Sequence, residues 1–405
     1  MSQSEFEHQN ELERKLAKIE ATLGLAPIGL ENKQDAVLSQ INVYPVKSIT
    51  GIELSSSWVE KQGLSFDRRF MVADMNGRMV TAREHHQMVR IKSALTASGL
   101  VLTYPEAKES LHLRFDEFEN QEVECQVWND TFSAYSTHPK ANDWASFVIG
   151  KPVQILFTGE QSNRQREKIQ TNVSFADGYP LLLASQASLD ELNARSPEGI
   201  AHSMAQFRPN IVVSNTEAFA EDGWKRIRIG EVEFEIVKPC MRCVLTTVNP
   251  KTAMRSEKNE PLNTLAKFRA DETGGIFFGQ NVIAKNEGLI RAGDVVEVLE
   301  TKEKEFYPDT SQDVVEVEPV KKITISIDGN LFEGDNQSTL LEQAEKAGVP
   351  VANSCRSGFC GTCKMTLESG KVDQPDMPAL FPGEIDEGKV LACCCVPKTD
   401  VELVS

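Results

Sequence analysis

Three cysteines near the C-terminal end are spaced for metal chemistry. Cys355, Cys360 and Cys363 follow the pattern C-x4-C-x2-C in a segment that contains Gly358 and Gly361. A loop of this kind can wrap three thiolates around an inorganic iron-sulfur cluster. The two glycines allow the tight backbone turns that point N-H groups at the sulfurs. The segment therefore predicts a [2Fe-2S] centre and electron transfer.

A fourth thiolate is needed, and three consecutive cysteines, Cys393, Cys394 and Cys395, can supply it. Chemistry alone does not choose among them, because all three can lie close together. Four thiolates also suit zinc, but zinc motifs pair one C-x2-C with another, and this segment contains a single such pair. The spacing therefore favours an iron-sulfur cluster over zinc.

A second pair, Cys240-Met-Arg-Cys243, lies between two β-branched runs, Val232 to Val237 and Val244 to Val248, which we expect to be strands. The pair is therefore expected on a loop or hairpin of a β domain. A thioredoxin-type pair would open a helix, and the β-branched residues that follow disfavour one. Nine cysteines without a secretion signal favour metal ligation over a disulfide framework.

Composition limits the class of protein. The 405 residues are 40% hydrophobic and 25% charged, which suits a globular protein of two or three domains. A formal net charge of -17 argues against a nucleic-acid polymer as partner and suits docking to a basic protein. The sequence contains no run of about 18 apolar residues, which is the length needed to cross a membrane. The start of the chain is acidic, so we expect a cytoplasmic location.

Residue patterns divide the chain into five segments and predict a mainly β fold with an α+β C-terminal part. A helix is expected around Leu189 to Arg195. The segments are a helical extension (1-36), a β domain (37-158), a β-barrel-like domain (159-300), an acidic linker expected to be mobile (301-319) and a compact α+β domain (320-405).

The C-terminal segment resembles plant-type ferredoxins, which implies a β-grasp fold. In that family the last ligand follows Gly-x-x-Leu-x and precedes a proline by four residues. Gly388-Lys-Val-Leu-Ala-Cys393 with Pro397 matches both landmarks. The resemblance therefore assigns Cys393 as the fourth ligand and leaves Cys394 and Cys395 as packing residues.

The preceding segments resemble the reductase branch of the MOSC family, whose YcbX-like bacterial members also carry a ferredoxin-like tail. The main match is Lys238 to Pro250, around the second cysteine pair. Further matches follow in the family's order: Tyr44-Pro-Val-Lys-Ser48, Asp67-Arg68, Val80-Thr-Ala-Arg83, Phe207-Arg-Pro-Asn210 and Phe278-Gly-Gln-Asn281. One departure is Ala253, where relatives tend to carry glycine.

This resemblance implies a molybdenum cofactor. The metal would be held by the dithiolene of the pterin and by one protein thiolate, Cys243, while Cys240 has either a supporting or a packing role. The phosphate of the pterin needs cations and hydrogen-bond donors. The matching stretches supply Lys47, Ser48, Arg68, Arg83, Arg208 and Asn210. Asp177, in Ala176-Asp-Gly-Tyr-Pro180, is a further candidate at the cofactor site.

The implied function is reduction of small N-hydroxylated compounds, such as hydroxylamino-purines. Electrons would come from an NADPH-dependent flavoprotein reductase through the chain's own [2Fe-2S] domain to molybdenum. Two other functions stay open. One is a sulfur carrier or sulfurtransferase in which Cys240 or Cys243 holds a persulfide. The other is a non-catalytic adaptor that binds the molybdenum cofactor and passes electrons.

Overall fold

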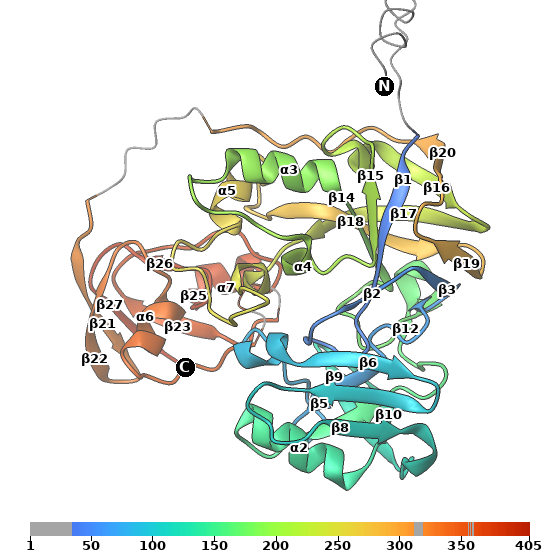
Figure 1. Ribbon diagram of the computed structural model, residues 1–405. Coiled ribbons are helices and arrows are strands. Elements are labelled where there is room, and N and C mark those ends of the chain that lie inside the picture. Colours follow the sequence, from blue (N-terminus) through green and yellow to red (C-terminus); the bar gives the residue numbers. More distant parts are fainter. Residues whose placement is uncertain (1–34, 312–318, 355, 357, 359) are drawn as a thin grey trace, which may run out of the picture. The chain divides into compact units, whose positions relative to one another are not determined.

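The computed structural model describes residues 35–311, 319–354, 356, 358 and 360–405 (Figure 1). The helical extension predicted for residues 1–36 therefore lies almost entirely outside the described residues, as does Cys355. Within them, strands dominate and helices are few. The predicted fold class, mainly β with an α+β C-terminal part, is confirmed.

An eight-stranded sheet unites the two ends of the region from residue 36 to residue 301. Its strands are, in hydrogen-bonded order, β2 (Ile52–Leu54), β1 (Val37–Val43), β15 (Ile211–Ser214), β14 (Leu181–Ser185), β18 (Phe277–Ala284), β17 (Val232–Met241), β16 (Trp224–Ile229) and β20 (Val296–Thr301). β14 and β15 are parallel. β1 pairs antiparallel with β15. The first strand therefore lies in the same sheet as strands of the predicted 159–300 domain.

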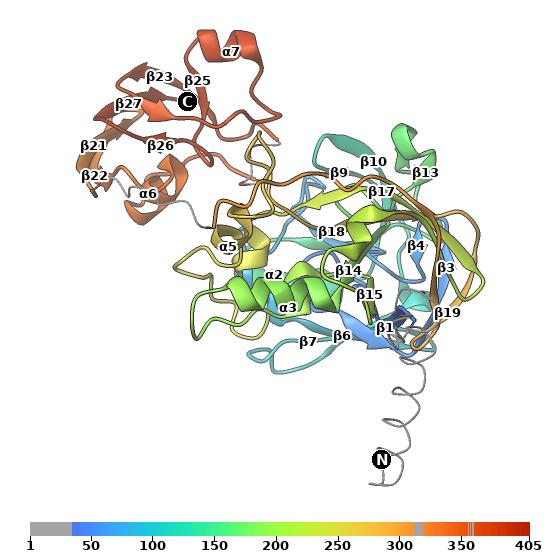
Figure 2. The same cartoon turned by 90° about the horizontal axis from the view of Figure 1, so that it is seen from above.

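The sheet buries alternate residues, as the period of two along its strands predicts. In β17, Val232, Phe234 and Ile236 are buried while Glu233 and Glu235 between them are only partly covered. Helix α3 (Gln186–Arg195) lies beside β14 and β15 (Figures 1 and 2). The predicted helix is thus confirmed, and it begins earlier than expected because the Ser185 hydroxyl accepts a hydrogen bond from Ser188 N at 3.0 Å.

Smaller sheets follow β1 and β2 along the chain. The first contains β5 (Phe70–Ala73), β11 (Gln154–Phe157), β10 (Asp130–Ser136) and β9 (Glu122–Val127). The second contains β6 (Lys92–Thr96), β7 (Gly99–Thr103) and β8 (Leu111–Arg114), and the third contains β19 (Gly288–Arg291), β3 (Ser56–Glu60) and β4 (Gly63–Leu64). Helix α2 (Pro139–Ile149) packs on β11. All of these strands except β19 come from the segment 37-158, and the bounds of that segment as a domain stay a prediction.

Shorter elements complete this region. They are the strand pair β12 (Gln165–Arg166) and β13 (Thr171–Asn172), the helices α4 (Met204–Phe207) and α5 (Leu262–Ala266), and the 3-10 turns η1 (His86–Arg90), η2 (Phe115–Glu117), η3 (Glu167–Ile169) and η4 (Ala220–Gly223). Loops next to η1, β13 and α4 carry Arg83, Asp177, Arg208 and Asn210, which the sequence assigns to a cofactor.

The strand predicted over Val244 to Val248 is wrong. Those residues form a 3-10 turn, η5 (Val244–Thr247). The carbonyl oxygen of Cys243 accepts hydrogen bonds from Thr246 N at 3.1 Å and Thr246 Oγ1 at 2.9 Å, and Thr247 Oγ1 bonds Val244 O at 2.7 Å. Threonine hydroxyls thus offer the backbone a local alternative to a strand, against the β propensity of the run.

The segment predicted as a mobile linker makes defined contacts as far as residue 311. Asp309 forms an ion pair with Arg195 at 2.6 Å. Thr310 N donates to Lys267 O at 2.7 Å, and the Tyr307 ring lies 4.3 Å from the Arg269 guanidinium carbon. The first half of the segment therefore packs against residues of the preceding region, while residues 312–318 lie outside the described residues.

The C-terminal part forms a five-stranded sheet with two short helices. The sheet order is β22 (Asn330–Asp335), β21 (Lys322–Ile327), β27 (Val401–Val404), β23 (Lys364–Ser369) and β25 (Lys389–Leu391). A separate pair is β24 (Val372–Asp373) with β26 (Val396–Pro397), and the helices are α6 (Leu340–Lys346) and α7 (Pro382–Asp386). Thr339 caps α6, accepting from Glu342 N at 3.4 Å, and Gly348 follows its end with φ +73°, as the sequence predicts.

Candidate functional site

The eight residues predicted around a molybdenum cofactor converge on one cavity. Its volume is about 560 Å³. Its lining includes all eight of them, Lys47, Ser48, Arg68, Arg83, Asp177, Arg208, Asn210 and Cys243. They come from loops between β1 and β2, on both sides of β5, before β14, between α4 and β15, and after β17. Segments far apart in sequence therefore meet at the cavity.

The lining of this cavity is strongly cationic, although the chain is acidic. It contains seven lysine and arginine side chains and only two acidic ones, Asp130 and Asp177. The chain as a whole has a formal net charge of -17. An acidic protein that concentrates basic side chains on one concave surface has a local field that attracts anions. The cavity is therefore suited to an anionic ligand.

Asp177 is bonded by two buried cations of the cavity. Its carboxylate accepts from Lys47 Nζ at 2.5 Å, Arg83 Nη2 at 2.7 Å and Trp128 Nε1 at 3.2 Å. Burial would raise the pKa of Asp177, but Arg83 and Lys47 hold that pKa well below its usual range. Burial lowers the pKa of Lys47 to about 8, against the attraction of Asp177. Two cations assigned to a cofactor anion are thus already paired with an internal carboxylate.

Arg68 and Arg208 form a second cationic group. Arg68 Nη1 bonds Asp67 Oδ2 at 2.6 Å and Asn210 Oδ1 at 3.1 Å. Arg208 Nη1 donates to Ile49 O at 2.6 Å, and within the described part of the chain Arg208 forms no ion pair. Burial and the nearby Arg68 lower the pKa of Arg208 to about 10. Arg208 is therefore the cation in this group that most needs an external anion.

The backbone is strained where it enters the cavity. Ser48, Arg68 and Arg208 have φ values of 71°, 48° and 57°, in the left-handed region that glycine favours. Strain of this kind costs of order 1–3 kcal/mol for each residue and persists mostly at functional sites. Ala253, which departs from its relatives, also has φ 59°, and this explains why glycine suits that position.

Cys243 follows the end of β17 by two residues and lines the cationic cavity. It precedes η5, and its thiol interacts with Arg83. Burial would lower the pKa of Arg83, but Asp177 and Cys243 together raise it above its usual value. Asn281 Nδ2 donates to Pro239 O at 3.1 Å and so fixes the strand before the cysteine pair. Arg83 is thereby placed beside the thiol of Cys243.

Cys240 lies within β17 rather than on the loop that the sequence predicts. A register shift between Pro239 and Met241 leaves Cys240 at a β-bulge, a feature that redirects side chains next to functional sites. Arg242 Nη1 donates to Cys240 Sγ at 3.1 Å and Arg242 Nη2 to Phe207 O at 2.6 Å. Sequence reasoning missed Arg242, although its place between the two cysteines was a usable signal.

Four further lining residues were not assigned to the cofactor from the sequence. Trp128 is at the tip of the β9–β10 hairpin with φ 55°, an unusual conformation for a bulky residue. Its ring lies 4.7 Å from the Arg83 guanidinium carbon. Arg166, Tyr179 and Lys238 line the same cavity, and Lys238 Nζ lies 5.4 Å from the centroid of the Tyr179 ring. Only the fold brings these residues to the cavity.

The residues of the cavity fit an anionic, thiolate-ligated cofactor. The buried Nε atoms of Arg83 and Arg242 have no hydrogen-bond partner among the described residues. Buried donors without partners are costly, so their presence favours a ligand that supplies acceptors. Lys47, Arg68, Arg83 and Arg208 could hold an anionic group, and Cys243 could hold a soft metal.

Two of the predicted cluster ligands are buried in the core of the C-terminal part. Cys363 and Cys393 belong to one hydrophobic cluster together with Cys395, and Cys360 is partly buried. Burial raises the pKa of the Cys395 thiol, which agrees with a packing role. Among the described residues no group of three metal-ligating side chains is assembled, and Cys355 lies outside them. The thiol donors suit iron and sulfur, and their assembly stays a prediction.

Gly358 and Gly361 have the conformations that the predicted ligand loop requires. Their φ values are 75° and 69°, in the region that disfavours side chains. A Cβ atom at Gly358 would lie 2.6 Å from Met377 Sδ. The backbone of this loop therefore agrees with a tight turn around a cluster.

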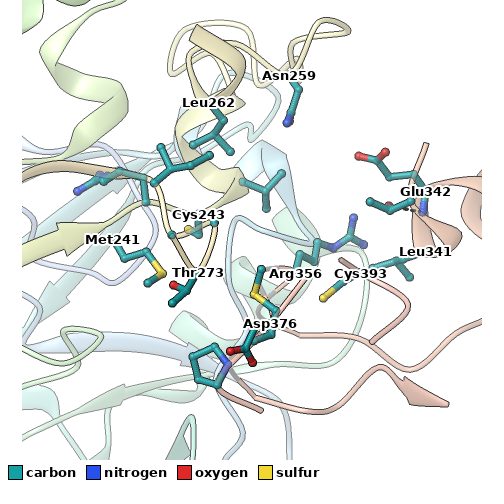
Figure 3. Close-up of a pocket in the computed structure, with 18 of the residues that line it drawn as sticks. Met241, Cys243, Asn259, Leu262, Thr273, Leu341, Glu342, Arg356, Asp376 and Cys393 are labelled. Atoms are coloured by element: carbon teal, nitrogen blue, oxygen red, sulfur yellow. Dashed lines mark hydrogen bonds between the residues drawn. The ribbon is translucent and has the colours of Figure 1, made fainter. Parts of the chain in front are cut away.

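Cys243 also lines a smaller hollow of about 190 Å³ (Figure 3). Met241 and Thr273 line it near Cys243, and the C-terminal residues Arg356 and Cys393 line it as well. Cys360, in turn, lines the larger cavity. Arg255 Nη2 forms an ion pair with Glu342 Oε1 at 2.5 Å. Two predicted cluster ligands thus share hollows with the predicted molybdenum ligand.

Family models match the chain in three consecutive stretches. A MOSC N-terminal beta barrel domain covers residues 35–152, a MOSC domain covers 170–297, and a 2Fe-2S iron-sulfur cluster binding domain covers 323–398. The order is the one that the sequence motifs predict. Fold and cavity therefore define a MOSC protein joined to a ferredoxin-type domain.

Proteins of similar sequence support the assignment to the MOSC family. Mitochondrial amidoxime-reducing component 1 of Xenopus laevis is 32% identical over 286 residues, which are 65% of this chain and 82% of that protein. The Homo sapiens protein of the same name is 31% identical over 286 residues, 66% of this chain and 84% of its own. Molybdenum cofactor sulfurase of Oryza sativa is 28% identical over 60% of this chain and 32% of its own. The chain belongs to the MOSC family, in the group of the amidoxime-reducing components.

No helix in the described part of the chain is long and apolar enough to cross a membrane. The relatives' names describe mitochondrial proteins. The cytoplasmic location stays a prediction from the sequence.

Proposed function

We propose that this chain is a molybdenum-cofactor-dependent reductase of small N-hydroxylated compounds, such as hydroxylamino-purines. Its own [2Fe-2S] domain would receive electrons from an NADPH-dependent flavoprotein reductase. Two relatives carry the name amidoxime-reducing component, and an amidoxime is itself an N-hydroxylated compound. The class of substrate and the reductase partner are part of the proposal.

One observation carries the proposal. Every residue that the MOSC resemblance assigns to the molybdenum cofactor lines a single cationic cavity, and the thiol of Cys243 lies there with them. Surface residues that matched a motif by chance would be scattered over several loops and faces. Their convergence supports one binding site with an anionic ligand and one thiolate.

The reaction takes two electrons and two protons for each N-O bond that is broken. The N-hydroxyl compound becomes the amine, the oxygen leaves as water, and NADPH becomes NADP⁺. When bound, the molybdenum cofactor supplies a metal that can accept the oxygen atom from the substrate.

The residues of the chain would bind and orient the cofactor. Arg83, which interacts with the thiol of Cys243, would place a positive charge beside the bound cofactor. Lys47 and Arg208 would hold the anionic end of the cofactor.

Electron delivery is the role of the C-terminal domain. Cys355, Cys360, Cys363 and Cys393 would hold a [2Fe-2S] cluster, which when bound would supply single-electron transfer, so that each turnover would need two transfers. Cys360 lines the larger cavity and Cys393 lines the hollow beside Cys243. This arrangement supports transfer within the chain, without a separate ferredoxin.

An anaerobic assay tests the proposal. Full-length protein with molybdenum and iron incorporated is mixed with a hydroxylamino-purine, NADPH and a flavoprotein reductase, and the amine product is measured. A reduced viologen dye replaces NADPH and the reductase in a parallel reaction. Amine formation is expected in both. No amine with either donor, from protein that contains both metals, would rule out the proposed reaction.

The Arg242-to-Cys240 hydrogen bond favours one other function, a sulfur carrier. A guanidinium at 3.1 Å would stabilise a thiolate or persulfide on Cys240. Mass spectrometry of the full chain after incubation with a cysteine desulfurase and cysteine distinguishes the two functions. A persulfide on Cys240, together with no amine formation, would favour the carrier.

A further inference from the structure

Tyr44 lies behind two arginines of the cationic cavity and lines a neighbouring hollow of about 350 Å³, a position that no cofactor assignment explains. It directly follows β1 and is 4% exposed. Its backbone N-H donates to Asp67 Oδ1 at 2.8 Å, and its hydroxyl donates to Pro209 O at 3.3 Å. A Cβ atom at Gly51 would lie 2.5 Å from Tyr44 Cε1, so Gly51 must stay a glycine for the ring to fit.

The ring of Tyr44 contacts both members of the second cationic group. The guanidinium carbons of Arg68 and Arg208 each lie 4.3 Å from its centroid. The face of an aromatic ring is negative and attracts a cation, more strongly when water is excluded. Tyr44 is therefore the one described side chain that contacts both guanidinium groups through its π face.

The two guanidinium groups carry like charges, and the ring of Tyr44 is a partner that they share. They repel each other, and Arg68 is one cause of the lowered pKa of Arg208. Asp67 bonds Arg68, but Arg208 has no ion pair among the described residues. Both arginines also have left-handed backbone conformations, with Arg68 Nη2 donating to Arg208 O at 3.3 Å. A strained, like-charged pair needs a fixed partner, and Tyr44 provides one.

We propose that Tyr44 is a positioning residue: its ring holds Arg68 and Arg208 at the cavity wall, where together they bind an anionic group of the cofactor. The inference rests on the proposed function only for the identity of that anion. Its core statement, that the ring maintains an anion site, applies to any small oxyanion in the cavity.

Fluorinated phenylalanines test this statement without changing the shape of the side chain much. Full-length protein is prepared without cofactor, and Tyr44 is replaced by phenylalanine or by phenylalanine with one to four ring fluorines. Fluorine withdraws electrons and weakens the negative face of the ring. The affinity for inorganic sulfate is then measured by calorimetry.

The expected result is near-native affinity with plain phenylalanine and a graded loss on fluorination, reaching about tenfold for the most fluorinated ring. The same replacements at Phe234, which is fully buried in the large sheet, should leave sulfate affinity unchanged. Abolition of binding by Arg208→Gln identifies the site. Sulfate affinity that does not change along the Tyr44 series would overturn the inference.

A second measurement links the inference to the cofactor. Tyr44→Leu should lose most of its molybdenum and pterin, whereas Phe234→Leu should keep both despite its own loss of stability. Equal cofactor contents in the two variants would also overturn the role of Tyr44. If the unmodified protein itself contains no molybdenum, the proposed function fails, while the sulfate series still decides the role of Tyr44.

Discussion

Arg83 Nη2 donates a hydrogen bond to Asp177 Oδ2 at 2.7 Å in the wall of the cationic cavity. The side chain of Arg83 is 5% exposed and that of Asp177 is 51% exposed, so the carboxylate faces the cavity. Lys47 bonds the other oxygen of the same carboxylate. Asp177 therefore occupies the place that an anionic ligand would take between Lys47 and Arg83, and a bound anion must share these two cations with it.

Removal of Asp177 should make the stability of the cofactor-free protein depend on an external anion. Asp177→Ala leaves Lys47 and Arg83 buried without their carboxylate, which we expect to lower the free energy of unfolding by about 1–3 kcal/mol. Millimolar sulfate should restore most of this loss, because it binds the folded state only. Urea unfolding with and without sulfate measures both effects.

Asp309→Ala is the matched control. It removes an exposed carboxylate that pairs with Arg195 outside the cavity. Its unfolding should respond to sulfate no more than that of the unmodified protein. An equal response in the two variants would mean that sulfate does not replace Asp177.

Anion binding should weaken as Lys47 loses its proton. Burial lowers the pKa of Lys47 to about 8, below its ordinary value, so the ammonium is charged at pH 7 and increasingly neutral above pH 8. Sulfate affinity of the cofactor-free protein is therefore expected to be constant near neutrality and to fall above about pH 8, approaching tenfold per pH unit. Sulfate keeps its own charge throughout this range.

Lys47→Arg provides the control for this titration, because a guanidinium keeps its proton over the same range. Its sulfate affinity should stay flat to about pH 9. An identical decline in both proteins would assign the titration to another group.

Cys243→Ser and Cys240→Ser should differ in their molybdenum electron paramagnetic resonance signals. If Cys243 binds molybdenum, its replacement by serine removes the soft ligand, changes the molybdenum electron paramagnetic resonance signal and abolishes turnover. Cys240, at the β-bulge beside Arg242, is not assigned as a ligand, and its replacement should leave the signal in place. An unchanged signal in Cys243→Ser, with cofactor retained, would instead favour the adaptor function.

Cys393, Cys394 and Cys395 can be separated by single replacements with serine. Cys393→Ser should lose the [2Fe-2S] absorption. Cys394→Ser should keep it. Cys395 is fully buried in the core of the C-terminal part, so Cys395→Ser should keep the cluster but lower thermal stability. Visible absorption and circular dichroism report the cluster directly, and loss of the cluster only in Cys394→Ser would overturn the assignment of Cys393.

The motif residues were predictable because the residues of each motif are close together in the sequence. Lys47, Arg83 and Asp177 were identified one by one, and the cavity brings them together. The ion pairs that join them were not predictable, since Asp177 meets Lys47 and Arg83 only after several strands have been arranged.

Two kinds of error have physical causes. Val244 to Val248 has the composition of a strand, but threonine hydroxyls close a turn there. Trp128 was missed because neither spacing nor composition marks a residue that contacts a cavity from the tip of a hairpin. Arg242 was missed although it stands between the two cysteines of the motif, because the β-bulge that directs it to the cavity is not visible in the sequence. A sequence pattern predicts the structure of its own segment. The set of charged side chains at the cavity depends instead on packing between segments that are distant in the sequence.

The central claim, that one chain carries both a molybdenum cofactor and a [2Fe-2S] cluster, is tested most directly by metal analysis combined with electron paramagnetic resonance on the purified full-length protein. The account predicts molybdenum and iron in a ratio of one to two, with separate signals from molybdenum and from the reduced cluster. Protein that contains the iron-sulfur cluster but no molybdenum, after expression with a working cofactor pathway, would contradict it.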